Sequence, residues 1–441
     1  MTQTSKPKVH WVSPLPEAET DIAHYTARIL PELAAACDLT LWTDARDWDR
    51  SLEAHCPVRY LDPDRVLPHD FARAGRGSGP DAVFVHIGNS WVFHSGLLRL
   101  VRRIPSIVVL HDLAIQELCF DAMHNHCFPR DIYETDITRW HGTAGLSAAR
   151  EVFDGRVKPI ELAKTYPGFE LTLDRAVSVL AHTPAAFEAV RATGIAPAYH
   201  LDLPFLPSAQ AGPAARAETG PLRFVQFGYI GPNRRLEQVL EALSSLRHEI
   251  DFRFDIMGKV WDPRHVQARL DELGLSGCVH IHGFVPEAEL DARLAEAHLV
   301  FNLRYPTMGE ASGSQLRIWN ASAAAVVTDL GWYGSLPEDT AFKIPLEREQ
   351  EALQDLIRRL HTDRTTGQAI GAAGRARLES HHTPVRYAQA IAHVARRFAE
   401  DAIHSMHARC ARDVLAQGTG SSQLYVHALA KRLLGASIHY P

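Results

Sequence analysis

The sequence predicts two doubly wound α/β domains in series, followed by helices. Short apolar runs alternate with longer segments of helical periodicity, which is the pattern of parallel βα units. The pattern stops at residues 203–221, which are rich in Pro, Ala and Gly, and then starts again. At 441 residues, the chain is also longer than one ordinary domain. We therefore expect an N-terminal domain over residues 1–205, a C-terminal domain over 206–383 and helices over 384–441.

The N-terminal domain is predicted from five apolar runs. These expected strands are Val9–Val12, Leu39–Thr43, Ala82–His86, Ser106–Leu110 and Ala176–Ala181. The expected helices are Ile22–Ala36, Trp91–Arg103 and Pro184–Ala192. Residues 112–170 show no strand pattern, so we expect an insertion of helices and loops there. Its run His124-Asn125-His126-Cys127 lacks the separated ligand pairs of a zinc site, which favours a pocket wall or plain packing over a metal.

The C-terminal domain is predicted in the same way. Its expected strands are Leu222–Phe227, Asp251–Ile256, Val279–His282, Leu299–Leu303 and Ala325–Thr328. Its expected helices are Leu236–Leu246, Pro263–Leu273, Glu287–Glu296 and a helix-like run from Gln315 to Ala324.

Composition narrows the classes of function and location. The net charge of −6 offers no broad positive field, so we expect no nucleic-acid partner. The six cysteines form no C-x-x-C pair, and neither a signal-peptide core nor a membrane-spanning apolar run occurs. We expect a soluble cytoplasmic protein. Two basic amphipathic segments, residues 97–103 and 424–434, leave open a peripheral contact with the inner membrane surface, although a solvated helix face is more usual.

Three loops of the C-terminal domain follow strands, where open α/β sheets bind ligands. The first runs from Gly228 to Arg235. Its glycines allow close approach of the backbone, and Arg234 and Arg235 could grip a diphosphate in bidentate fashion. The alternative is a Gly-Pro turn with solvated arginines.

The other two loops carry a flat-ligand site and a carboxylate. Gly283, Phe284 and Val285 follow a strand at a place where backbone atoms could meet a nucleotide base. Glu310 precedes a small-residue turn formed by Ser312, Gly313 and Ser314, whose amides would face the same crevice. The alternative for Glu310 is a favourable position near a helix dipole.

Together these loops resemble the retaining nucleotide-sugar glycosyltransferases of family 4, which have the GT-B fold. The resemblance covers most of the chain and is strongest from Phe224 to Pro337. It rests on "FGYIGPNRR", "HGFVPEAEL" and "GEASGSQLRIWNASAAAVVTDLGWYGSLP". In the N-terminal domain, "SPLPEAETDIAHY", "HIGNSWVFH" and "IVVLHDL" look like a bacterial polysaccharide-assembly branch. The resemblance implies two Rossmann-like domains facing a central cleft, with the terminal helices returning to the N-terminal domain.

The resemblance also assigns roles to single residues. Arg234 falls where the family has a phosphate-binding lysine, and Glu310 falls on the first acid of the Glu-x7-Glu motif, which holds donor-sugar hydroxyls. His111 falls where the family has a histidine close to the donor sugar. We therefore expect His111 and Glu310 to be catalytic. For His111 and Asp112 the alternative is a helix start capped by Asp112.

The acceptor site is expected on the N-terminal domain, with Asn89, Asp112 and Asp21 as candidates. The sequence departs from the family pattern at two places. The second acid of the motif, which holds the ribose in many relatives, is Ile318 here. The first loop usually carries glycine where this chain has Thr20 and Asp21, so that Asp21 either points away from a diphosphate or serves the acceptor.

The resemblance implies transfer of a sugar from a nucleotide-diphosphate sugar to a hydroxyl of a glycan, lipid-linked or small-molecule acceptor, with retention of configuration. No cofactor and no dedicated metal are expected, since arginines and helix amides would neutralise the leaving group. A catalytically inert GT-B binding or assembly partner is the main alternative. A GT-B epimerase or a pyridoxal-phosphate phosphorylase is a third, but neither Lys259 nor Lys343 has a convincing setting for that cofactor.

Overall fold

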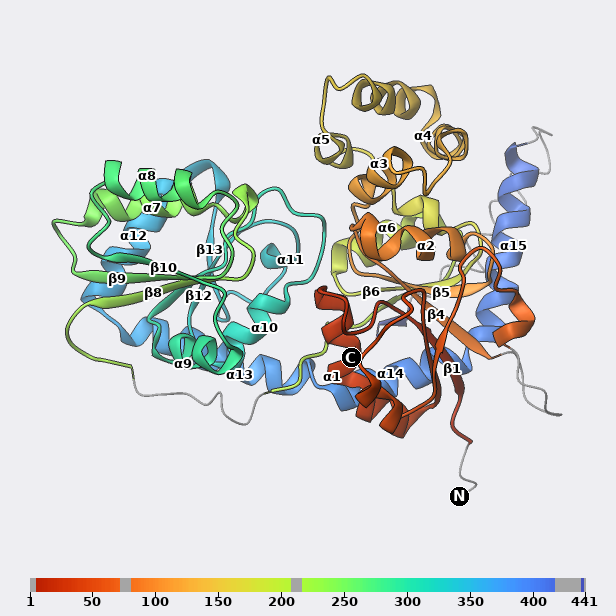
Figure 1. The fold of residues 1–441 in the computed structure, drawn as a ribbon, viewed down its shortest axis with the longest axis horizontal. Coiled ribbons are helices and arrows are strands. Elements are labelled where there is room, and N and C mark those ends of the chain that lie inside the picture. The colour runs from red at the N-terminus through yellow and green to blue at the C-terminus, as the bar shows by residue number, and fades with distance from the viewer. Residues whose placement is uncertain (1–4, 72–80, 208–215, 417–437, 440–441) are drawn as a thin grey trace. The chain divides into compact units, whose positions relative to one another are not determined.

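The computed structural model describes residues 5–71, 81–207, 216–416 and 438–439, which form two compact units (Figure 1). Both are parallel-sheet α/β domains, which confirms the predicted fold class. Unit 1 comprises Met1–Pro204, Met308–Ala311 and Pro384–Pro441, and unit 2 comprises Phe205–Thr307 and Ser312–Thr383.

Residues 308–311 lie within the range predicted for the C-terminal domain, yet they group with unit 1. The backbone N–H of Ala114 donates to the carbonyl of Met308 at 2.8 Å. The Thr183 hydroxyl donates to the carbonyl of Gly309 at 3.1 Å. These contacts cross more than a hundred residues of sequence, so periodicity along the chain gives no sign of them.

The sheet of unit 1, as far as the structure describes it, has the order β14-β7-β6-β5-β4-β1-β2-β3, with every pairing parallel. Its strands are β1 Lys8–Val12, β2 Asp38–Thr43, β3 Val58–Tyr60, β4 Ala82–Ile87, β5 Ser106–Leu110, β6 Ala176–Ala181, β7 Ala198–His200 and β14 Ile438–His439. Sequence periodicity predicts the five longer strands within one or two residues. It misses β3, β7 and β14, because two or three residues are too few to show a period.

Helices cover both faces of this sheet. They are α1 Asp21–Ala36, α2 Trp91–Val101, α3 Gln116–His124, α4 Arg130–Phe153, α5 Pro159–Ala163, α6 Pro184–Thr193, α14 Pro384–Arg396 and α15 Phe398–Ala416, with 3-10 turns at Arg50–Ala54, Pro68–Phe71 and Phe169–Thr172. Helices α2 and α6 lie on one face, and α1 and α14 lie on the other (Figure 1).

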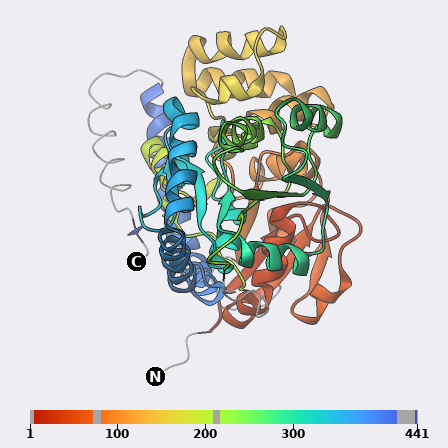
Figure 2. The ribbon, with the colours of Figure 1, turned by 90° about the vertical axis from the view of Figure 1, so that its left-hand side faces the viewer.

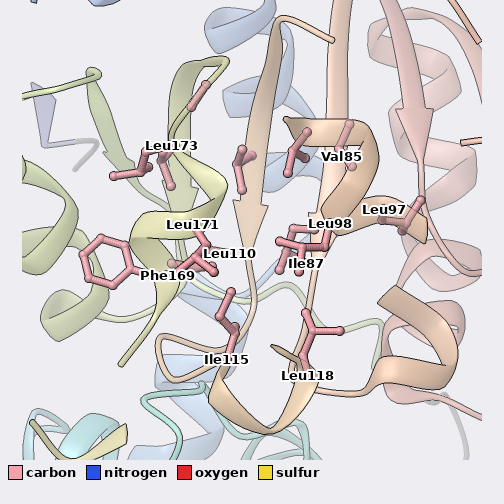
Figure 3. Close-up of a cluster of buried hydrophobic side chains, with 14 of the residues drawn as sticks. Val85, Ile87, Leu97, Leu98, Leu110, Ile115, Leu118, Phe169, Leu171 and Leu173 are labelled. Atoms are coloured by element: carbon pink, nitrogen blue, oxygen red, sulfur yellow. The ribbon is translucent and has the colours of Figure 1, made fainter. Parts of the chain in front are cut away.

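The two faces of the sheet hold separate apolar cores. Val108 of β5 belongs to the cluster that contains Leu98 of α2, and Figure 3 shows this cluster around β4 and β5. Val109, the next residue, belongs to the opposite cluster, which contains Ile391 of α14. Burial of successive side chains on opposite faces is the pattern of a parallel strand covered on both sides.

Helices α3, α4 and α5 follow β5 and precede β6 along the chain, in the region expected as an insertion. In Figures 1 and 2 they stand at the opposite end of unit 1 from α1. Buried Tyr133 donates to Gln116 Oε1 at 2.8 Å, and Gln116 Nε2 donates to the carbonyl of Tyr166 at 2.6 Å. The run His124–Cys127 begins at the last residue of α3 and continues into the following turn. In the described part of the chain no three His, Cys, Asp or Glu side chains are placed to hold a metal.

The two terminal helices pack on unit 1. Tyr387 of α14 and Tyr25 of α1 share a hydrogen bond of 2.5 Å between their hydroxyls. Tyr199 donates to Asp401 of α15 at 2.6 Å. The amphipathic segment 424–434 lies outside the described residues. Among the helices that the structure describes, none has the length and apolar character to cross a bilayer.

The sheet of unit 2, over its described residues, has the order β10-β9-β8-β11-β12-β13 and is also fully parallel. Its strands are β8 Leu222–Phe227, β9 Phe252–Met257, β10 Val279–Gly283, β11 Leu299–Phe301, β12 Ala325–Thr328 and β13 Phe342–Ile344. The short strand β13 is the one that the sequence pattern misses.

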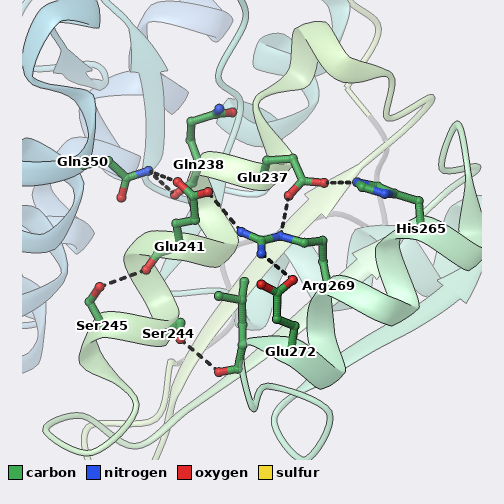
Figure 4. Close-up of polar contacts among 10 residues, drawn as sticks. Glu237, Gln238, Glu241, Ser244, Ser245, His265, Arg269, Glu272 and Gln350 are labelled. Atoms are coloured by element: carbon green, nitrogen blue, oxygen red, sulfur yellow. Dashed lines mark hydrogen bonds and ion pairs between the residues drawn. The ribbon is translucent and has the colours of Figure 1, made fainter.

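The helices of unit 2 are α7 Leu236–Leu246, α8 Pro263–Glu272, α9 Glu287–Glu296, α10 Gly313–Asn320, α11 Gly331–Gly334, α12 Glu349–Thr362 and α13 Thr365–His381, with 3-10 turns at Pro232–Arg234 and Leu346–Arg348. Helices α7, α8 and α12 cover one face, and α9, α10 and α13 cover the other (Figure 1). Arg269 of α8 pairs with Glu237 and Glu241 of α7 and with Glu272 (Figure 4). Such exposed pairs align the helices but contribute little free energy each.

Candidate active site

Glycines follow three neighbouring strands of unit 2 at their carboxyl ends. Gly228, Gly258 and Gly283 come directly after or at the end of β8, β9 and β10, and all three have positive φ. At Gly258 a Cβ atom would lie 1.9 Å from the carbonyl oxygen of Gly228. The two loops therefore touch through their backbones, and no larger residue fits at Gly258.

The loop after β8 is held by the loop after β9. The N–H of Ile230 donates to the carbonyl of Lys259 at 2.8 Å, and the N–H of Trp261 donates to the carbonyl of Ile230 at 3.1 Å. Tyr229 and Lys259 are both exposed on these loops. This pairing gives the loop from Gly228 to Arg235 a defined shape before any ligand binds.

Arg234 lies at the centre of this edge and is 6% exposed. Its Nη1 donates to Asn302 Oδ1 at 3.1 Å, and its Nη2 lies 3.4 Å from Ser314 Oγ. Three segments far apart in the sequence therefore converge on one guanidinium. The sequence did not lead us to predict Asn302 as a site residue. The signal for it is a polar residue directly after the apolar run of β11.

Arg235 has a different environment from its neighbour. Its φ of +59° turns the chain, and its guanidinium forms an ion pair with the buried carboxylate of Glu349. Glu349 lies 114 residues further along the chain, so the sequence pattern does not reveal it. Because that carboxylate pairs with the guanidinium, Arg235 stabilises the loop, and its predicted contact with the diphosphate stays a prediction.

Ser312, Gly313 and Ser314 form the start of α10. Ser312 is the N-cap, since its Oγ accepts the N–H of Gln315 at 3.1 Å. Gly313 faces open space, because a Cβ built there would meet no atom within 4 Å. The first N–H groups of a helix lack intrahelical acceptors and suit a phosphate. Ser312 is thus a structural cap, and Gly313 and Ser314 remain the candidates for ligand contact.

Phe284 is the most exposed large apolar side chain of the described residues, at 92%. It follows Gly283, whose φ of +68° turns the chain at the end of β10, and it precedes the partly buried Val285. A solvent-exposed aromatic ring at the carboxyl end of a strand can stack on a nucleotide base, and the base loop stays a prediction.

The corresponding edge of unit 1 holds a cluster of four histidines, which we call the histidine cluster: His86, His94, His111 and His182. His111 follows β5, and its Nε2 lies 2.8 Å from Nδ1 of His86. The ring of His182 lies 5.1 Å from the ring of His111. Nδ1 of His94 donates to the carbonyl of His86 at 3.2 Å.

The histidine cluster is neutral at pH 7. Burial lowers the pKa of His94 and of His182 to about 4. Burial, together with the neighbouring histidines, lowers the pKa of His86 and of His111 well below the ordinary value. Nε2 of His86 is buried and meets no partner among the described residues. A buried lone pair is less costly than a buried unpaired N–H, so the proton of His86 belongs on Nδ1. His111 then accepts at Nε2 and carries its own proton on Nδ1.

Glu310 lies on the segment that packs on unit 1. Its Oε2 accepts the N–H of Met308 at 2.7 Å. Gly309, between them, has a φ of +76°, and a Cβ there would lie 2.6 Å from Cβ of Leu113. Ser312, not Glu310, is the N-cap of α10, and the alternative position of Glu310 near the helix dipole stays open.

Two of the predicted acceptor residues lie together. Asp112 Oδ2 accepts the N–H of Asn89 at 2.7 Å, and Asn89 Nδ2 donates to Glu117 Oε2 at 2.8 Å. Burial raises the pKa of Glu117, a residue that the sequence analysis did not single out. Asp112 does not cap α3, which begins at Gln116, so that alternative is wrong. Asp21 is the exposed first residue of α1, where its charge favours the helix dipole.

Ile318, in place of the second motif acid, is fully buried in α10. The two neighbours that could replace a carboxylate are already engaged. Arg317 donates to Asp291 at 2.8 Å, and buried Asn320 lies beside Arg375. The structure thus offers no substitute acid among these residues.

A family model described as glycosyl transferase-like matches residues 234–393. The matched residues are thus similar to a glycosyltransferase-like sequence over about a third of the chain, mostly in unit 2. The match begins at Arg234 and includes β9 to β13, so it contains most of the edge described above for unit 2. No curated protein sequence is significantly similar to the chain.

Solved glycosyltransferase structures show the same architecture over nearly the whole chain. Sucrose-phosphate synthase from Thermosynechococcus elongatus is 15% identical, with a TM-score of 0.57, and covers 90% of this chain and 100% of its own. HepE of Anabaena in complex with UDP is 13% identical, with a TM-score of 0.55 over 88% and 99%. The lipopolysaccharide outer core galactosyltransferase WaaB is 12% identical, with a TM-score of 0.51 over 90% and 99%. At these identities the likeness establishes the GT-B fold.

Proposed function

We propose that this protein is a retaining glycosyltransferase that moves a sugar from a nucleotide-diphosphate sugar to a hydroxyl acceptor. The observation that carries the proposal is the convergence of Arg234, Asn302 and Ser314 at the carboxyl edge of a glycosyltransferase-like domain. We expect the acceptor to be a glycan or a lipid-linked sugar, and the role of the protein to be polysaccharide assembly in a bacterium. We expect the protein in the cytoplasm, with the inner membrane surface as a second location.

Unit 2 would bind the leaving nucleotide diphosphate. Negative charge grows on the diphosphate as the glycosidic bond breaks, and a preorganised positive group stabilises the transition state most. The guanidinium of Arg234 is such a group, since Asn302 and Ser314 fix its position. Amides at the start of α10 would add to it. We expect no dedicated metal, because these groups neutralise the charge themselves.

Glu310 and His111 would act on the sugar. A carboxylate accepts hydrogen bonds from sugar hydroxyls, and the contact with Met308 N–H orients that of Glu310. His111, held at Nε2 by His86, would donate from Nδ1 to an oxygen near the reacting carbon. A neutral imidazole suits this position, since it does not repel the positive charge that develops on the sugar ring.

The first donors to test come from the solved relatives. HepE has been solved with UDP and with UDP and glucose. Purified protein should release UDP from UDP-glucose or another nucleotide sugar, and UDP should raise its melting temperature because it binds the native state. The proposal would be overturned if no uridine, guanosine or thymidine donor gave either release of its nucleoside diphosphate or a shift in melting temperature.

A catalytically inert binding partner is the second candidate, and buried Ile318 favours it, because the second acid of the motif is absent. Binding and turnover separate the two. An inert partner would show a melting shift with nucleotide diphosphates that depends on Arg234, yet release no UDP with any donor or acceptor. Release of UDP that is lost in Arg234→Ala would decide for the enzyme.

A further inference from the structure

Unit 1 contains a cavity of about 420 Å³ that none of the active-site residues assigned above lines. It lies between α4, the chain just before β6, and α15. Five arginines line it: Arg102, Arg139, Arg175, Arg409 and Arg412. Its volume is within the range of small-molecule sites.

The lining is strongly positive. Among the described lining residues, Asp174 is the one carboxylate, against five guanidinium groups. It pairs with Arg102 at 2.8 Å and Arg139 at 3.3 Å, and Arg102 also reaches Asp136 behind the wall at 2.6 Å. Arg269 of unit 2 is the contrasting case, since three carboxylates surround that single guanidinium (Figure 4). The described lining thus gathers five guanidinium groups around one cavity.

A tryptophan adds a second feature of a binding site. Trp140 lines the cavity, and Arg412 lies over its ring at 4.4 Å. Its Nε1–H is buried and meets no acceptor within the described residues. A buried donor without an acceptor in this wall costs free energy.

We propose that this cavity binds a phosphate-bearing anion, separately from the donor site of unit 2. Guanidinium groups bind phosphate in a bidentate geometry, and several of them around one cavity favour a phosphate ester or a diphosphate over a single carboxylate. A free organic phosphate and the headgroup of an anionic lipid share this chemistry. The inference does not depend on the proposed glycosyl transfer, since it uses none of the same residues.

Cys410 provides a local probe, because it lines the cavity and is exposed, whereas Cys37, Cys56 and Cys119 are buried. The rate of alkylation of each cysteine by iodoacetamide is measured by peptide mass spectrometry in inorganic diphosphate, in inorganic phosphate and in chloride of equal ionic strength. We expect millimolar diphosphate to slow alkylation of Cys410 at least about threefold relative to chloride. Alkylation of the half-buried Cys127 and Cys278 should not change.

The variant Arg175→Gln/Arg412→Gln should lose this protection while keeping its fold, since Arg175 is exposed and Arg412 is only partly buried. A matched variant with the same loss of charge, Arg65→Gln/Arg191→Gln, removes two exposed arginines elsewhere on unit 1 and should keep the protection. Arg234→Ala should keep it as well, which separates this site from the donor site. The single variant Arg175→Gln repeats the test if the double variant melts at a lower temperature.

Vesicles distinguish the two sources of phosphate. If vesicles of phosphatidic acid in phosphatidylcholine protect Cys410 at a lower phosphate concentration than free diphosphate does, that result assigns the cavity to a lipid headgroup. Protection by free diphosphate alone assigns it to a soluble phosphate. Equal alkylation rates in diphosphate, vesicles and chloride, or protection that survives in Arg175→Gln/Arg412→Gln, would overturn the proposal.

Discussion

The carboxyl edges of the two sheets use ionisable side chains in opposite ways. In unit 2 the edge centres on Arg234, a group that keeps its charge at every physiological pH. In unit 1 the edge centres on the histidine cluster, whose members burial keeps neutral. Both sheets are parallel and covered on both faces, so the backbone alone does not decide the charge of an edge.

This difference in charge decides which ligands each edge can bind. A fixed positive charge among hydrogen-bonding oxygens suits an anionic diphosphate, and its interaction is strongest when desolvated. Neutral imidazoles offer one donor and one acceptor each, which suits sugar hydroxyls and avoids adding charge.

The largest effect is expected for Arg234→Ala. Loss of the guanidinium should remove about 2–4 kcal/mol of transition-state stabilisation, as for a lost oxyanion donor. This corresponds to a fall in kcat/KM of roughly 30- to 1,000-fold. Arg234→Lys should recover much of the rate, because it keeps the charge and loses only the bidentate geometry. Arg264→Ala, at an exposed position of α8, is the matched control. Steady-state UDP release measures all three, and an alanine variant with wild-type kcat/KM would remove the phosphate role.

The second effect concerns pH and the neutral histidines. In the unfolded chain, His94 and His182 bind protons below about pH 6.5. In the folded chain they do so only below about pH 4. The free energy of unfolding should therefore fall with falling pH in this window, by about 1.4 kcal/mol per pH unit for each histidine.

The variant His94→Asn tests this, because asparagine can still donate to the carbonyl of His86. Denaturant unfolding of the full chain should show a shallower loss of stability between pH 6.5 and 5 than in wild type. His24→Asn, an exposed change on α1, should keep the wild-type slope. An unchanged slope in His94→Asn would show that His94 is not neutral in the folded chain.

The third effect is expected for Glu310→Gln, which should lower transfer at least about tenfold, or ~1.4 kcal/mol. Glutamine retains an oxygen that can accept the N–H of Met308, so the segment should keep its conformation and the melting temperature should change little. Glu310→Ala should lose the same activity. If instead the melting temperature collapses while the folded fraction keeps full specific activity, Glu310 has a structural role only.

The smallest effect is expected for the ribose. Ile318 offers no acceptor, and Arg317 and Asn320 are engaged elsewhere in unit 2. A hydrogen bond to a charged group is worth roughly 1.5–3 kcal/mol, so its loss should leave UDP and 2′-deoxyuridine diphosphate with dissociation constants within a few-fold of each other. Paired calorimetric titrations in one buffer measure this. A preference above about thirtyfold for UDP would show that another residue holds the ribose.

The sequence by itself determined the two α/β domains and most of their long elements. A period of two or of 3.6 residues is a local property, and strands such as β5 and β8 and helices such as α7 carry it in full. Glycines after strands, such as Gly228 and Gly283, are equally local signals. They suffice to locate the loops of the candidate site, including Arg234.

Which distant residues these loops contact depends on the tertiary structure. It paired Arg235 with Glu349, placed Glu310 on the segment that packs on unit 1, and brought His86 against His111. It also gathered arginines from α4 and α15 around one cavity. Each of these is a contact between segments distant along the chain. Their side chains meet only after the sheets have formed and buried their apolar faces, so no periodicity or short motif contains them.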